Sequence, residues 1–190
     1  MKKYLALVLS LLLLLVPVLA AAEQPEAFSP EAFRDALQAE IEKTSPELLA
    51  NTTIELNEER EIIIICRGVA VAKLYFDHIG PDDMVSGEGT QNHLVLLIPI
   101  PEANVNSVKL CYAYYTIFAS MVRHILYPAS DINECFVYIV DTFDKAISSG
   151  TGDIRSATEE DGVYRETILI CGAPADAMYI GYEVRIIGLS

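Results

Sequence analysis

The stretch Ser107–Leu126, SVKLCYAYYTIFASMVRHIL, carries the clearest helical pattern in the chain and decides the class of fold. At about 100° per residue, its polar residues fall mainly on one narrow stripe: Lys109, Thr116, Ser120 and Arg123. The other positions are mostly apolar or aromatic, whereas an ordinary surface helix has a wider polar face. The pattern therefore predicts a central helix that is covered on more than one side, with Phe118 and Val122 in the core.

Strand patterns precede and follow this helix. Residues 52–57 and 61–66 predict a hairpin, because an alternating segment and an apolar run are joined by a polar turn. Further strands are predicted at residues 93–100, 135–140, 163–171 and 178–187. Pro99 and Pro101 restrict the first of these to the edge of a sheet or to its own end. In the last strand Glu183 and Arg185 alternate with apolar residues, which indicates one wet face and a place near an edge.

Helices are also expected near the N-terminus. Ser29 resembles a helix cap, Pro30 suits a first helical position, and apolar residues then recur at four-residue intervals to about Lys43. Residues 69–79 fit a helical stripe, although their first half could also extend the preceding strand. We expect a helix there. The fold prediction is α+β: a mostly antiparallel sheet packed on a central, largely buried helix at about 107–126, with additional N-terminal helices.

The first 22 residues have the three parts of a secretory signal peptide. Lys2 and Lys3 form a positive start, an apolar run follows, and small residues end the segment at Ala20–Ala22. We therefore expect a secreted or extracytoplasmic protein with its signal cleaved near Ala20 or Ala22. An uncleaved membrane anchor is the alternative, because the apolar segment is just long enough to span a bilayer. Residues 23–28 are predicted to be a flexible mature N-terminus, and residues 29–190 a single α+β domain.

The charge balance restricts the classes of partner. The 190-residue chain has 13 basic and 27 acidic residues, a net charge of −14 at pH 7. Such a surface repels phosphate backbones and anionic lipids, so we expect no nucleic acid and, after signal cleavage, no membrane as a partner. We expect the net negative charge to favour solubility outside the cell and to attract cations or basic partners.

Four cysteines allow two disulfides in an exported protein, either Cys66–Cys171 or Cys111–Cys135 among the pairings. Cys66 and Cys171 each end an apolar run, however, where cysteine often behaves as a small buried hydrophobe. Buried thiols are the preferred interpretation. Because no pair has the C-x-x-C spacing, a zinc site is not expected.

No motif specifies a reaction. The chain has no G-x-S-x-G or S-x-x-K sequence, and residues 148–152 lack the lysine of a phosphate-binding loop. The histidines His78, His93 and His124 are far apart, and His124 suits a structural position near the end of the central helix. Asp77–Asp83 is the densest group of possible metal ligands but lacks a calcium-loop pattern. We therefore assign no catalytic residue, no cofactor and no metal.

These observations favour an exported, non-catalytic binding or interaction module for an unknown protein or small-molecule ligand. The loops expected at residues 80–92 and 143–162 are its candidate recognition surfaces, because loops on a scaffold commonly carry recognition. The alternatives are a small extracytoplasmic hydrolase with an active site assembled from distant residues, and a structural or assembly component of the cell envelope. The strands expose more apolar surface than two layers cover, which predicts a homodimer.

The export prediction can be checked directly. N-terminal sequencing of the exported protein should find a first residue of Glu23 or Ala21, because small residues precede both positions. Recovery of the chain in a membrane fraction with Met1 retained would instead identify the segment as an anchor.

Overall fold

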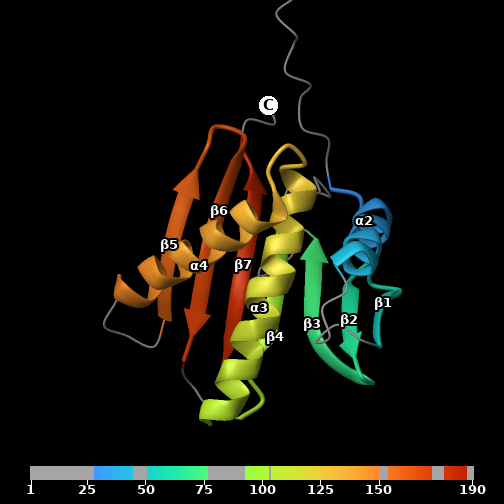
Figure 1. Cartoon of the computed structure of the whole chain (residues 1–190), viewed down its shortest axis with the longest axis horizontal. Coiled ribbons are helices and arrows are strands. Elements are labelled where there is room, and N and C mark those ends of the chain that lie inside the picture. The colour runs from blue at the N-terminus through green and yellow to red at the C-terminus, as the bar shows by residue number, and fades with distance from the viewer. Residues whose placement is uncertain are drawn as a thin grey trace, which may run out of the picture.

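The computed structural model describes residues 28–44, 51–76, 93–102, 104–149, 154–172 and 178–187, so the predicted signal peptide lies outside the described residues. One antiparallel sheet of seven strands forms the body of the molecule, in the order β1-β2-β3-β4-β7-β6-β5 (Figure 1). The strands are β1 Thr52–Leu56, β2 Ile62–Cys66, β3 Val69–Phe76, β4 His93–Pro99, β5 Ile154–Glu160, β6 Tyr164–Cys171 and β7 Tyr179–Ile186. The helices are α2 Pro30–Thr44, α3 Val105–Leu126 and α4 Ile132–Ser148. The predicted α+β class is confirmed.

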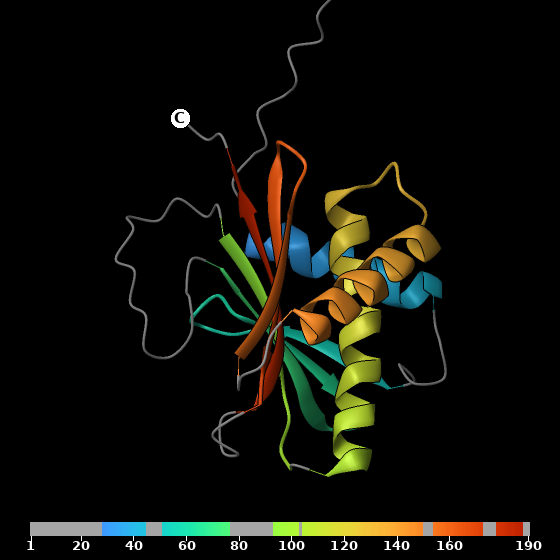
Figure 2. The same cartoon turned by 90° about the vertical axis from the view of Figure 1, so that its left-hand side faces the viewer.

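All three helices lie on one side of the sheet (Figure 2). Helix α3 contacts β3, β4 and β7, α4 contacts β5 and β6, and α2 contacts β1 and α3. Phe118 and Val122 of α3 are fully buried, as the helical pattern predicts. In the described part of the chain, no helix is both long enough and apolar enough to cross a membrane.

Helix α2 begins as the sequence predicts. Pro30 is its first residue, and the backbone N–H of Ala32 donates to the Ser29 hydroxyl over 3.3 Å. The apolar residues at four-residue spacing, Phe33, Leu37 and Ile41, are buried. They cover the end of the sheet formed by β1 to β3, where Phe33 meets Phe76 with ring centroids 6.0 Å apart.

The helix predicted at residues 69–79 is wrong, because Val69–Phe76 forms strand β3; residues 77–79 lie outside the described residues. A two-residue turn joins β2 to β3, with φ of 53° at Arg67 and 79° at Gly68. This left-handed pair is typical of a type I′ turn, whose twist matches that of a hairpin. Burial then alternates along β3, with Ala72 and Leu74 inside. The turn and the pairing with β2 therefore favour a strand over a helix at residues 69–76.

The strand predicted at residues 135–140 is also wrong, because these residues lie within helix α4. Asp131 and Glu134 form a capping box, in which each side chain accepts from the other residue's backbone N–H. Its buried face repeats at helical spacing through Cys135, Ile139 and Phe143. The loop predicted at residues 143–162 is corrected as well, since α4 continues to Ser148 and β5 begins at Ile154.

Two strands expected at an edge lie in the middle of the sheet. Strand β4 pairs with β3 and β7, and β7 pairs with β4 and β6. Pro99 is tolerated because it is the last residue of β4. The predicted alternation in β7 is confirmed: Ile180, Tyr182 and Val184 are buried against the helices, while the alternate residues face the other side.

The polar stripe of α3 is only partly in solvent. Lys109 is exposed, but Thr116 and Ser120 are buried. Their hydroxyls donate back to carbonyls of the same helix, Thr116 to Ala113 over 3.1 Å and Ser120 to Thr116 over 2.5 Å. These bonds satisfy the hydroxyls locally, so the stripe can pass beneath other elements without leaving unpaired donors.

At the end of that stripe, Arg123 forms a buried ion pair with Glu166 of β6. The Arg123 Nε lies 3.1 Å from the Glu166 carboxylate, and the two side chains are 14% and 5% exposed. The hydroxyls of Tyr127 and Tyr182 also donate to Glu166, the first over 2.8 Å. Three donors thus satisfy a carboxylate that burial would otherwise penalise. The helix layer is bonded to the sheet at this point.

Aromatic rings enclose the Arg123 guanidinium. Its central carbon lies 4.2 Å from the ring centroid of Tyr127 and 3.8 Å from that of Tyr138. Both contacts are in the range of cation–π attraction, which strengthens where water is excluded. Burial is the main cause that raises the pKa of Tyr138, to about 12. The tyrosines around the cluster are therefore neutral hydroxyl donors at physiological pH.

No disulfide joins the four cysteines, all of which are buried. Thr52 contacts the Cys66 sulfur at 3.2 Å, and the Cys111 thiol donates to the Pro99 carbonyl over 3.4 Å. Burial raises the pKa of both thiols. The preferred interpretation as buried thiols agrees with these contacts.

Replacing Glu166 tests the bond between helix layer and sheet. Glu166→Gln keeps the volume but leaves the buried Arg123 without its counter-charge, so the free energy of unfolding should fall by about 3–5 kcal/mol. Glu160→Gln removes a pair whose side chains are about half exposed and should cost less than about 1 kcal/mol. Urea unfolding followed by circular dichroism measures both, and equal losses would contradict a dominant role for the buried pair.

Candidate functional site

The two described histidines lie in different surroundings. His93 of β4 is 5% exposed, and its Nε2 lies 2.7 Å from the Glu183 carboxylate. The Nε2 of His124 in α3 lies 3.7 Å from the carboxylate of Glu40 in α2. His78 is outside the described residues. The structure thus brings one histidine and one carboxylate into hydrogen-bond contact, on the side of the sheet away from the helices.

We call this side the outer face. The strand registers place on it the odd-numbered residues of β1, β2, β4, β6 and β7, the even-numbered residues of β5, and Lys73 and Tyr75 of β3. No described helix lies against it (Figure 2). Its side chains divide along the strands into a polar end and an aliphatic end.

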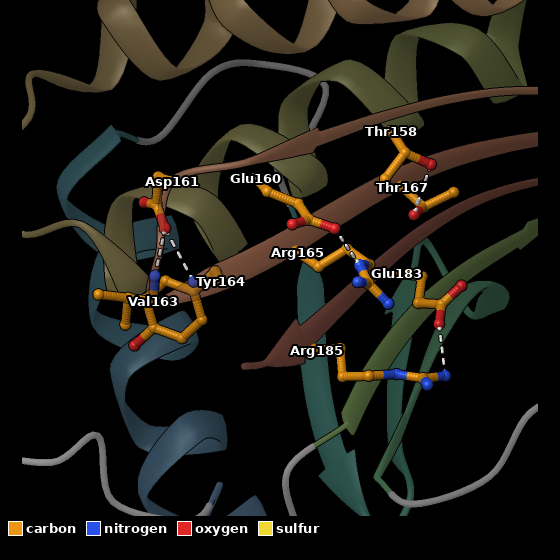
Figure 3. A network of polar contacts seen from close by, with 9 residues as sticks. All are labelled: Thr158, Glu160, Asp161, Val163, Tyr164, Arg165, Thr167, Glu183 and Arg185. Atoms are coloured by element: carbon orange, nitrogen blue, oxygen red, sulfur yellow. Dashed lines mark hydrogen bonds and ion pairs between the residues drawn. The ribbon is translucent and has the colours of Figure 1, made fainter. Parts of the chain in front are cut away.

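The polar end is a row of charged side chains across four strands. Register places His93 opposite Arg185, Arg185 opposite Arg165, and Arg165 opposite Glu160. With Glu183, which neighbours Arg185 along β7, these residues form what we call the charged row. Figure 3 shows its members on β5, β6 and β7.

Hydrogen bonds and ion pairs order the charged row. Glu183 accepts from His93 over 2.7 Å and from Arg185 over 3.2 Å. Arg165 donates to Glu160 over 2.5 Å. The hydrogen bond from His93 is the main cause that lowers the pKa of Glu183, against the opposing effect of burial. Glu183 is therefore ionised at neutral pH and holds two cationic or polar neighbours in place.

A second row of hydroxyls lies beside the charged row. Thr158 of β5 and Thr167 of β6 are cross-strand partners, and their hydroxyl oxygens are 3.1 Å apart (Figure 3). At the end of the same hairpin, the Asp161 carboxylate accepts from the backbone N–H groups of Val163 and Tyr164. These bonds fix the β5–β6 hairpin, so the polar groups of the outer face lie on a rigid support.

The aliphatic end of the outer face contains half-buried apolar side chains. Leu97 of β4 and Leu169 of β6 lie on either side of Gly181 of β7 in the register. Ile63 and Ile65 of β2 are also half-buried, but Lys73 of β3 lies between Leu97 and Ile63 in the register. These apolar side chains are therefore neither fully exposed nor fully enclosed.

The described polar groups of the outer face can be compared with what bond cleavage requires. A hydrolase needs a nucleophile within hydrogen-bond reach of its base, and the base oriented by a third group. The His93 ring bonds to Glu183, while the hydroxyls of Thr158 and Thr167 bond to each other. Among the described residues, no group of three potential ligands could hold a metal ion.

The other positions singled out in the sequence have structural neighbours or lie beyond the described part. Glu159 of β5 pairs with Lys145 of α4 at 2.6 Å, which connects this strand with the helix layer. The possible ligands at Asp77–Asp83 and the loop at residues 80–92 are outside the described residues. Residues 143–148 belong to α4 and residues 154–160 to β5, so the described part of the range 143–162 does not form the expected loop.

The sequence analysis missed the outer face because it did not assign the strand neighbours. The alternation in β7 predicts one solvent-facing side. The charged row, however, forms only because β4, β7, β6 and β5 are neighbours in that order. A glycine at position 181, inside a strongly alternating strand, was the available signal.

The chain matches no family model, no curated protein and no solved structure.

Proposed function

We propose that the chain is an exported, non-catalytic interaction module that binds a protein partner through the outer face of its sheet. The observation that carries the proposal is the contrast between the two faces. The helix side is a continuous core that includes Leu96, Phe118 and Tyr182, all of them fully buried. The outer face combines half-buried aliphatic side chains with the ordered charged row.

The chemistry of this face fits a protein surface as ligand. Protein interfaces have an apolar centre and a polar rim with satisfied hydrogen bonds. Leu97 and Leu169 belong to the aliphatic end, whereas Glu160 and Arg165 belong to the charged row. Because the hairpin and the ion pairs already order these groups, binding would need little further side-chain ordering.

One observation favours the competing hydrolase. The contact of 2.7 Å between His93 and Glu183 resembles a base held by its orienting carboxylate. The same contact also has a structural explanation, since it satisfies a buried imidazole and fixes Glu183 against Arg185. Without a nucleophile in hydrogen-bond contact with His93 among the described residues, interaction remains the preferred function.

Site-specific photo-crosslinking in the native host tests the proposal. A benzoylphenylalanine replaces either Thr167, on the outer face, or Lys109, exposed on the helix layer. Illumination of the exported full chain should give a covalent adduct from position 167 and little or none from position 109. Adducts from position 109 alone would contradict the proposal, as would the absence of any adduct from position 167.

A further inference from the structure

Strand β5 forms one edge of the sheet, where it pairs with β6 alone among the described strands. The backbone N–H of Asp161 donates to the Tyr164 carbonyl, and bonded pairs alternate along an antiparallel ladder. The odd-numbered residues of β5 therefore direct their backbone groups to β6. The N–H and C=O groups of its even-numbered residues point away from the sheet. Such a free row of backbone groups can pair with a strand of another chain.

The C-terminal end of helix α4 lies against this edge. Figure 1 shows α4 crossing the sheet toward β5, and the two elements are in contact. The hydroxyl of Ser149, which caps α4, lies 2.7 Å from the Ser156 carbonyl oxygen and 2.9 Å from that of Ala146. The Ser156 carbonyl is one of the groups that point away from the sheet, so the helix end covers part of the free row.

Two further contacts join the same helix end to β5. The Lys145 Nζ lies 2.6 Å from the Glu159 carboxylate. The Arg155 guanidinium donates to the Ile147 carbonyl over 2.8 Å. We call Lys145, Ile147 and Ser149 the edge guard, because together they hold a backbone carbonyl and two charged side chains of the edge strand.

The sequence of β5 is complementary to itself in one antiparallel register. If two copies of the strand pair about a two-fold axis at Ala157, Arg155 of each copy lies opposite Glu159 of the other. The same register places Ser156 opposite Thr158. Both of these residues have outward-pointing backbone groups, as a hydrogen-bonded pair requires. Two opposite-charge pairs and a backbone ladder can thus form between identical edges, as a two-fold interface demands.

The edge guard engages the same groups that this pairing would use. Its lysine holds the carboxylate of Glu159, and its isoleucine carbonyl accepts from Arg155. Its serine hydroxyl lies at the Ser156 carbonyl, where the N–H of a second strand would approach. Each contact within the chain therefore competes with a contact between chains.

We propose that the edge guard is an autoinhibitory contact that keeps the β5 edges of two copies apart. When its contacts are lost, the free edge takes the β5 strand of a second copy in the register centred on Ala157. Because this pairing uses the backbone of the β5 edge rather than the outer face, it is independent of the proposed function.

Removal of the guard side chains tests this proposal. The double variant Lys145→Ala/Ser149→Ala frees Glu159 and the edge backbone, and sedimentation equilibrium of the exported protein measures its association. The association constant should rise about tenfold over that of the wild type. Amide exchange at Ser156 and Thr158, whose N–H groups point outward, should slow as the protein concentration rises.

The matched control is Lys43→Ala/Ser148→Ala, which makes the same two changes at exposed positions outside the edge guard. It should associate like the wild type. Circular dichroism shows whether each variant is folded, and if the Ser149→Ala change loosens the fold, Lys145→Ala alone decides.

A charge swap in the released double variant tests the register. Arg155→Glu places like charges opposite each other and should reverse the gain in association. Arg155→Glu combined with Glu159→Arg restores opposite charges and should recover it. An association constant that is unchanged in the folded double variant, or an equal gain in the matched control, would overturn the proposal. Association that Arg155→Glu does not reduce would overturn it as well.

Discussion

The packing of α2, α3 and α4 against the same face of the sheet leaves an antiparallel sheet with two unlike sides. Every strand alternates, so half of the side chains are directed at the helices and half away from them. On the helix side the strands supply fully buried residues such as Ile64, Leu96 and Tyr182. On the other side the same strands present Ile63, Leu97 and Glu183. The chemistry of the outer face therefore follows from the position of the helices.

The buried cluster around Glu166 determines how the helix layer is seated. Apolar packing alone allows a helix to slide or rotate on a sheet, whereas a charge pair with fixed hydrogen-bond directions does not. Arg123 reaches Glu166 from α3, and Tyr182 reaches it from β7, so α3, β6 and β7 meet at one carboxylate. We expect the cluster to contribute to the uniqueness of the packing as well as to stability, as buried polar groups do in some proteins.

Much of the fold could be predicted from local patterns. The central helix, the N-terminal helix beginning at Pro30, the β1–β2 hairpin and the alternation of β7 all follow from spacing and capping signals. Errors occurred where a short apolar run fits either period, as at residues 69–79 and 135–140. In each case a nearby signal distinguishes strand from helix. The Arg67–Gly68 turn precedes strand β3, and the capping box of Asp131 and Glu134 begins helix α4.

The candidate site was harder to predict than the fold. His93 and Glu183 are 90 residues apart in the sequence, and Glu160 belongs to a segment that was expected to be a loop. Their proximity depends on β7 lying between β4 and β6, an order that no local pattern specifies. Long-range strand order therefore limits what could be inferred about function, since the charged row exists only across several strands.

The accessibility of outer-face methyl groups tests the central claim most directly. A soluble nitroxide broadens the methyl resonances of solvent-exposed side chains, and the broadening can be compared between the isolated exported protein and the same protein mixed with an extract of its native host. The account predicts that Leu97 and Leu169 become shielded in the mixture, while Val137 stays accessible. Shielding of Val137 alone, or equal broadening of all three residues in both samples, would contradict the claim that a partner binds the outer face.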